Sequence, residues 1–157
     1  MNSPLPDISE LGPLLRHLEA CYPNEGCGVI LKGPGGFRVV PLENVYDRYH
    51  AIDPEQFPRT ARTAYLIDPR AWLKLSTEAE GRGEAVSHIV HSHADVGAYF
   101  SDEDKAMAAP EGQPLHPGVG YLVVAVNRGR VDNARLFQWA SGSYFEVPIE
   151  LPSSRAS

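Results

Sequence analysis

The stretch from Ala85 to Asp104 constrains the fold most, because it joins an apolar run to a cluster of polar side chains. Residues 85–90 are rich in β-branched residues and follow two nearby glycines, so they predict a short buried strand. His91 and His93 come directly after this run, two residues apart. Because side chains alternate along a strand, we expect both imidazoles on the same side of a sheet. Two imidazoles that converge at a strand end are a starting point for a zinc site.

The residues that follow supply a third candidate ligand. Residues 101–109 predict a short helix that ends at Pro110, and Asp104 lies in its first turn, within reach of the imidazoles. A catalytic zinc ion usually takes three protein ligands and leaves a fourth position for water. The candidate ligands are therefore His91, His93 and Asp104, in the pattern His-x-His, seven residues, Ser, two residues, Asp.

Simpler interpretations stay open for each of these residues taken singly. Ser101 and Asp104 have the spacing of a capping box, which alone would account for both. The two histidines can also be an exposed strand end that binds nothing. Capping and metal binding do not exclude each other, since Ser101 can cap the helix while Asp104 binds the metal. The joint pattern favours the metal site, because a separate glutamate, Glu25, lies upstream.

Glu25 belongs to the segment 22–30, Tyr-Pro-Asn-Glu-Gly-Cys-Gly-Val-Ile, and precedes a short apolar strand. A lone glutamate in such a loop is usually solvated. Together with the downstream pattern, however, this segment resembles the first motif of the JAMM/MPN family of zinc metalloproteases. The resemblance covers roughly residues 8–150 and implies the MPN variety of the deaminase-like sandwich. By the same match, Glu25 would be the general base.

The residue types suit hydrolysis of an amide or isopeptide bond. A zinc ion on the three candidate ligands would lower the pKa of its bound water to about 7. Glu25 would take the proton of that water and pass it to the leaving amine. Ser101 would donate a hydrogen bond to the oxyanion of the tetrahedral intermediate. Base deamination is not favoured, because the sequence lacks the signature His-x-Glu with Pro-Cys-x-x-Cys.

The resemblance also implies a substrate class. Family members cleave after the C-terminal Gly-Gly of ubiquitin-like proteins, and bacterial relatives are similar to enzymes that process sulfur-carrier proteins, including release of cysteine from a carrier. The expected partner is therefore a ubiquitin-like or sulfur-carrier protein whose tail lies extended beside a sheet edge. Many relatives have proline after the second histidine and before the serine, where this chain has Ala94 and Phe100. These departures concern substrate choice more than metal binding.

Three other functions stay open beside this one. The first is a hydrolase of small amides or peptides unrelated to carriers, which activity on a short acyl-amide alone would favour. The second is a catalytically silent MPN scaffold, although such domains usually lose motif residues and none is missing here. The third is a non-catalytic zinc-binding module, which would be indifferent to the substitution Glu25→Gln.

Composition excludes several other classes. A chain of 157 residues suits a single domain, and 43% apolar residues argue against disorder. A formal charge of −6 disfavours nucleic acid and anionic membranes as partners. No run is long enough to span a membrane, and the N-terminus lacks the features of a signal peptide. Cys21 and Cys27 imply no disulfide framework and are expected in the core. The expected compartment is the cytoplasm.

The order of segments predicts an α+β fold with a mixed, curved sheet flanked by helices. Residues 1–7 are expected to form a loose leader before a domain at 8–150, and residues 151–157 a frayed tail. Because proline is tolerated only near a helix start, Pro13 suggests that the first helix begins near Gly12. Helices are expected over 8–22, 68–80 and 101–109, and strands over 27–31, 37–42, 64–67, 85–90, 119–126, 131–139 and 144–149.

Two loops are expected near the site. Residues 44–63 show no clear period, and such a long connection could hold substrate or simply be a surface loop. Residues 110–118 form a second loop, which contains His116. We do not favour His116 as a fourth ligand, because a catalytic zinc ion needs an open position.

Overall fold

The computed structural model describes residues 5–149. Four helices occur in this range: α1 (Ile8–Cys21), α2 (Tyr46–Ile52), α3 (Pro69–Gly81) and α4 (Asp102–Ala108). The strands are β1 (Cys27–Gly33), β2 (Gly36–Leu42), β3 (Ala85–Ala94), β4 (Gly120–Asn127), β5 (Arg130–Ala140) and β6 (Ser143–Val147). None of these helices is long and apolar enough to cross a membrane.

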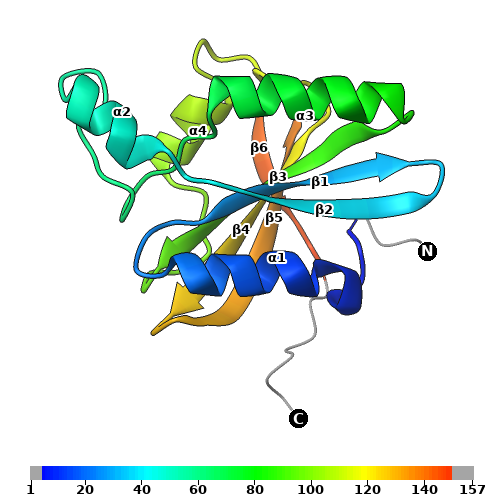
Figure 1. Cartoon of the computed structure of the whole chain (residues 1–157), viewed down its shortest axis with the longest axis horizontal. Coiled ribbons are helices and arrows are strands. Elements are labelled where there is room, and N and C mark those ends of the chain that lie inside the picture. The colour runs from blue at the N-terminus through cyan, green and yellow to red at the C-terminus, as the bar shows by residue number, and fades with distance from the viewer. Residues whose placement is uncertain (1–4, 150–157) are drawn as a thin grey trace.

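The six strands form one mixed sheet in the order β2-β1-β3-β4-β5-β6. The central pair, β3 and β4, is parallel, and the other neighbouring pairs are antiparallel. Helix α1 lies on one face of the sheet, whereas α3 lies on the other (Figure 1). The predicted α+β class, with a mixed sheet flanked by helices, is confirmed.

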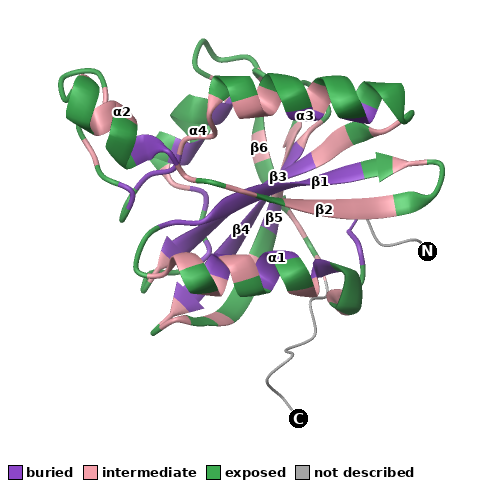
Figure 2. Ribbon diagram, in the orientation of Figure 1, coloured by how far each residue is buried: buried purple, intermediate pink, exposed green. Residues whose placement is uncertain are grey.

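The two faces of the sheet carry separate apolar clusters, as strand alternation requires. On β1, Val29 packs in the same cluster as Leu75 of α3, whereas Ile30 packs with the leucines of α1. Strand β4 is buried on both faces, as expected for a central strand with helices on either side. Figure 2 shows that buried segments gather in the strands at the middle of the sheet. The α1 residues that fill one side of the core are Leu11, Leu14, Leu15 and Leu18.

Helix α1 begins at Ile8, so the predicted start near Gly12 is wrong. Asp7 and Glu10 form a capping box in which each side chain accepts a hydrogen bond from the other residue's backbone N–H, and this fixes the earlier start. Pro13 is accommodated inside the helix. Leu5, within the segment expected to be a loose leader, is buried in the α1 cluster. Residues 1–4 of that segment, and the whole expected tail at 151–157, lie outside the described residues.

Two further predictions between residues 44 and 67 are wrong. The segment predicted as a loop contains α2, which lacks a side-chain cap and is held by edge-to-face packing of Tyr46 and Tyr49 on Phe57. Such tertiary contacts leave no periodic signal in the sequence. Residues 64–67 form no strand and contribute one isolated bridge, because the Asn44 side chain binds part of their backbone instead.

His88 lies on β3 and packs against Gly120 on the α1 side of the sheet. A Cβ added to Gly120 would lie 2.9 Å from the imidazole Cδ2, so this position requires glycine. The imidazole is 3% exposed, and its Nδ1 bonds to the Ser87 hydroxyl at 2.8 Å. Its Nε2 has no hydrogen-bond partner among the described residues. Burial, with a smaller contribution from the charge of Lys32, lowers the pKa of His88 to about 4.

We predict that His88 makes the stability of this protein depend on pH. Since the pKa is about 4 in the folded chain and 6.5 in the unfolded chain, the unfolded chain takes up the proton first as pH falls. The contribution of His88 is therefore complete above pH 6.5 and falls by about 3 kcal/mol as the pH drops to 4. Urea unfolding across this range should show a steeper loss for the wild type than for His88→Gln. Equal slopes would contradict the prediction.

Candidate metal centre

Strand β3 carries both histidines between two neighbouring strands. It extends beyond the predicted apolar run to Ala94, so His91 and His93 lie within the strand. His91 pairs with Cys27 of β1 on one side, and both histidines pair with β4 on the other. The imidazoles are 0% and 3% exposed. The sheet therefore fixes the positions of both rings, as the alternation of side chains predicted.

Helix α4 brings Asp104 to the same place. Ser101 is its N-cap, and the capping box forms: the Ser101 hydroxyl accepts from the Asp104 N–H, and the Asp104 Oδ2 accepts from the Ser101 N–H, both at 3.0 Å. The Asp104 side chain also faces the imidazoles and is largely buried. Asp104 thus takes part in the capping box of α4 and also lies beside the two histidines.

Ligand atoms from these three side chains converge. The His91 Nε2 lies 3.3 Å from the His93 Nε2 and 3.2 Å from the Asp104 Oδ1, and the His93 Nε2 lies 3.1 Å from the Asp104 Oδ2. Around a tetrahedral zinc ion with bonds of about 2.0–2.1 Å, neighbouring ligand atoms are about 3.3 Å apart. The His93 Nδ1 donates to the Gly97 carbonyl at 2.9 Å. In a neutral imidazole this leaves the lone pair on Nε2, where it can bind a metal ion. This geometry fits a zinc ion.

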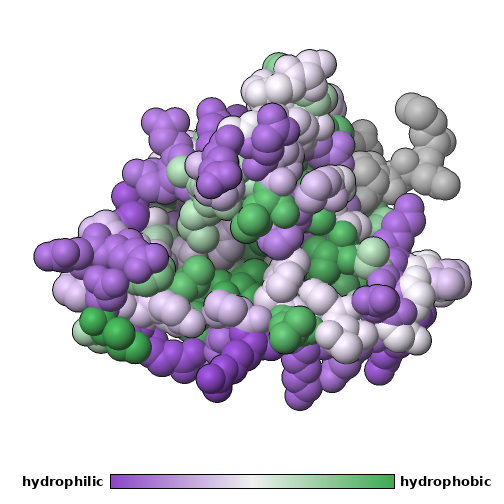
Figure 3. All heavy atoms as spheres, turned by 90° about the horizontal axis from the view of Figure 1, so that it is seen from above, coloured by the Kyte–Doolittle hydropathy of each residue, from purple (hydrophilic) through white to green (hydrophobic). Residues whose placement is uncertain are grey.

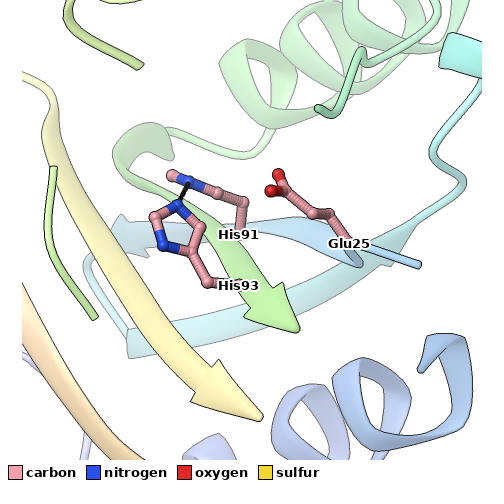
Figure 4. A group of neighbouring side chains, drawn as sticks. All are labelled: Glu25, His91 and His93. Carbon is pink, nitrogen blue, oxygen red and sulfur yellow. Dashed lines mark hydrogen bonds between the residues drawn. The ribbon is translucent and has the colours of Figure 1, made fainter. Parts of the chain in front are cut away.

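Glu25 lies beside these groups, two residues before β1. Glu25, His91 and His93 offer ligand atoms within 4.8 Å of one another, all from buried residues, so this group could hold a metal ion. Figure 4 shows the three side chains on the same side of the sheet. The Glu25 Oε1 is buried and has no hydrogen-bond partner among the described residues. A buried carboxylate oxygen in this state is costly unless another group binds it.

The electrostatics of the centre favour a positive charge between the imidazoles and Asp104. Burial would raise the pKa of Asp104, but the charge of His91 and hydrogen bonds from His91, His93 and the Ser101 N–H hold it well below its usual range. Burial would lower the pKa of His93, but the hydrogen bond and charge of Asp104 raise it. Burial, aided by the charge of Asp104, raises the pKa of Glu25 to about 7. Glu25 can therefore hold or release a proton near neutral pH.

The loop between β3 and α4 is anchored at both ends. At its start, Asp95 accepts hydrogen bonds from the Tyr22 hydroxyl and from the Arg128 N–H. At its end, Phe100 is buried and stacks on Phe137 with the ring centroids 5.1 Å apart. Phe100 is one of the two positions where the sequence departs from the proline common in relatives. Aromatic packing therefore anchors the chain just before Ser101.

Two cavities border the centre. A small polar one, of about 120 Å³, is lined by Glu25, His93, Ser101, Arg59, Arg62, Thr63, Ala94, Val96, Tyr99 and Glu103. A larger apolar cavity, of about 290 Å³, has Tyr65 in its wall. The Tyr65 ring stacks on the His91 imidazole with the ring centroids 4.3 Å apart. Hydrophobic atoms line a hollow on the face that carries α3 (Figure 3). His116 packs on Trp72 in the wall of the apolar cavity and is not part of the group formed by Glu25 and the two histidines.

The sequence of this chain matches a known family. Residues 10–140 match the family described as prokaryotic homologs of the JAB domain. The chain belongs to this family. The match confirms the resemblance to the JAMM/MPN family, and together with the group formed by Glu25, His91 and His93 it indicates a JAB domain with a possible metal site.

Two solved structures share the fold of this JAB domain. A protein from Desulfitobacterium hafniense, known as a solution structure, is 22% identical with a TM-score of 0.67, over 93% of this chain and 90% of the other. A protein from Salinibacter ruber is 24% identical with a TM-score of 0.53, over 92% and 90% of the two chains. No curated protein matches the chain.

Sequence reasoning missed Asn44, which joins Glu25 to the segment after β2. Its Nδ2 donates to the carbonyls of Glu25 and Ala64 at 2.8 and 3.0 Å, and its Oδ1 accepts from the N–H groups of Tyr46 and Leu66 at 3.0 and 3.1 Å. All four hydrogen-bonding positions of the amide are thus used. A single asparagine in a loop carries no pattern that would have revealed this role. Sequence reasoning also missed that the walls of the two cavities include Arg59, Arg62 and Tyr65, because single residues in this segment form no pattern.

We predict that Asn44→Ala destabilises the JAB domain by about 2–4 kcal/mol, because it removes four hydrogen bonds and leaves partly buried backbone groups unpaired. The exposed Asn24 is the matched control, and Asn24→Ala should change the free energy of unfolding by less than about 0.5 kcal/mol. Urea unfolding measures both. A loss for Asn44→Ala no larger than for the control would contradict this role.

Proposed function

We propose that this JAB domain hydrolyses an amide or isopeptide bond, with zinc bound by His91, His93 and Asp104 and with Glu25 as general base. One observation carries the proposal. Atoms of three side chains converge at the spacing of a tetrahedral zinc site, and a buried carboxylate with an oxygen that lacks a hydrogen-bond partner among the described residues lies beside them.

Asp104 and Glu25 compete for the place of the third ligand, and the distances favour Asp104. Its two oxygens lie 3.2 and 3.1 Å from the Nε2 atoms of His91 and His93. Glu25 makes no hydrogen bond or ion pair with either imidazole, although its ligand atom lies within 4.8 Å of theirs. That separation suits a carboxylate that contacts the attacking water rather than the metal.

The chemistry divides among these residues. A zinc ion bound there would supply a Lewis acid, which lowers the pKa of a water molecule and polarises a carbonyl group. The Glu25 carboxylate takes a proton from the attacking water and delivers it to the leaving nitrogen, for which a pKa of about 7 is suitable. The Ser101 oxygen accepts from the Asp104 N–H, so its own hydrogen is free to donate to the substrate oxygen as negative charge develops.

The proposed substrate is a ubiquitin-like or sulfur-carrier protein with a C-terminal Gly-Gly. Family membership supports this class. The cavity beside Glu25 and Ser101 measures only about 120 Å³, and a glycine tail without side chains suits so narrow a site. The same small volume also favours the second candidate function, hydrolysis of small amides or peptides. The two candidates differ in whether the body of a carrier protein is needed.

The test uses zinc-loaded protein and a sulfur-carrier protein from the same genome, extended by a few residues beyond its Gly-Gly. Intact mass over time should show loss of the extension with the wild type. Glu25→Gln should be at least about 100-fold slower, because it removes the general base. The exposed residue Glu43 is the control, and Glu43→Gln should cleave at the wild-type rate.

Each contradictory outcome has a separate meaning. Equal rates for Glu25→Gln and wild type would remove Glu25 as the base. No cleavage by zinc-loaded wild type would remove this carrier as a substrate. Hydrolysis of a short acyl-amide without cleavage of the carrier would favour the second candidate function.

A further inference from the structure

Two arginines line the same small cavity as Glu25, and the proposed reaction gives neither a role. Arg59 and Arg62 lie in its wall together with Glu25, His93 and Ser101. The positive charge of Arg59 acts on Glu25. It lowers the pKa of the Glu25 carboxyl, against the larger effect of burial, which raises it. A cavity where hydrolysis is proposed therefore carries two guanidinium groups.

The two arginines differ in how far they are neutralised. The Arg59 Nη1 forms an ion pair with the Glu103 Oε1 at 3.0 Å, and its Nε donates to the Thr63 carbonyl at 3.3 Å. The Arg62 guanidinium is exposed and makes no hydrogen bond or ion pair with residues 5–149. Asp95 is near enough to interact electrostatically with Arg62, but its carboxylate accepts from Tyr22 and the Arg128 N–H instead. Arg62 is thus available to bind an anion.

The turn that bears these arginines is attached directly to the backbone of Glu25. The Ala61 carbonyl accepts from the Glu25 N–H at 2.7 Å, and the Ala61 N–H donates to the Asp47 carboxylate at 2.7 Å. The Thr63 N–H closes the turn on the Thr60 carbonyl at 3.0 Å. Arg62 therefore starts from a backbone position that is fixed relative to the group proposed to protonate the leaving nitrogen.

The chemistry of the proposed substrate suggests which anion would bind. A Gly-Gly tail carries no charge near the scissile bond on the acyl side. An isopeptide-linked lysine side chain presents only methylene groups next to its nitrogen. A C-terminal residue, in contrast, has its α-carboxylate two bonds from the scissile nitrogen, and a guanidinium binds a carboxylate through paired N–H donors. The cavity of about 120 Å³ equals the volume of about four water molecules, which suits a single small residue.

We infer that Arg62, assisted by Arg59, binds the free α-carboxylate of the residue whose amine leaves, so that the protein removes single C-terminal residues in preference to cleaving isopeptide bonds. This inference rests on the proposed function and extends it to the leaving group. It gives the segment 44–63 a role in substrate selection, through the turn at 60–63.

The first test measures binding, with the acetylated peptide Gly-Gly-Ala and its C-terminal amide as probes. Zinc-loaded Glu25→Gln, which is proposed to be inactive, should bind the free acid at least about tenfold more tightly than the amide. Adding Arg62→Ala should abolish this difference. Adding Arg70→Ala, at an exposed arginine on α3, should leave it unchanged. Equal binding of acid and amide by the Glu25→Gln protein would overturn the carboxylate site.

The second test measures kcat/KM on carriers that end in Gly-Gly-Ala, either as the free acid or as the amide. Arg62→Ala should lower kcat/KM for the free acid by about 10- to 100-fold, mainly through KM, and leave the amide unchanged. An equal loss on both substrates would overturn a role in carboxylate recognition. Selective binding of the acid peptide without any cleavage would instead overturn the proposed function and leave the carboxylate site standing.

Discussion

The contact of Asp104 with two imidazoles is the interaction on which the rest of this site depends. The carboxylate accepts from the N–H of Ser101, which starts α4, and faces the Nε2 atoms of His91 and His93. One side chain therefore joins a helix start to a central strand. Because β3 is paired on both sides and buried, the imidazoles have little freedom, and the capping box limits that of the carboxylate. The three side chains are therefore held close together by β3 and by the start of α4.

Glu25 is placed by a second set of contacts, which are independent of the first. Its N–H and carbonyl bind Ala61 and Asn44, both from the segment that follows β2. Its carboxylate is left without a partner beside the imidazoles. Burial keeps the pKa of this carboxylate near 7, while the imidazoles keep that of Asp104 low. Two carboxylates in one site thus differ in protonation because their surroundings differ, which suits one as a base and the other as a ligand.

The parts predictable from sequence are those set by local rules. Alternation along a strand put both imidazoles on one face, and the capping pattern put Asp104 at the start of a helix. The missed parts depend on contacts between distant segments. Helix α2 is stabilised by aromatic packing on Phe57, and residues 64–67 are held by the side chain of Asn44. The early start of α1 depended on Asp7, whose capping box outweighs the effect of Pro13.

The affinity for zinc tests the central claim most directly, that Asp104 is a metal ligand and Glu25 is not. Competition with a chelator should give one zinc ion per wild-type chain. Glu25→Gln should bind zinc within a few-fold of the wild type, whereas Asp104→Asn should bind it more than about 100-fold more weakly. The reverse order, with zinc lost from Glu25→Gln and retained by Asp104→Asn, would contradict the account.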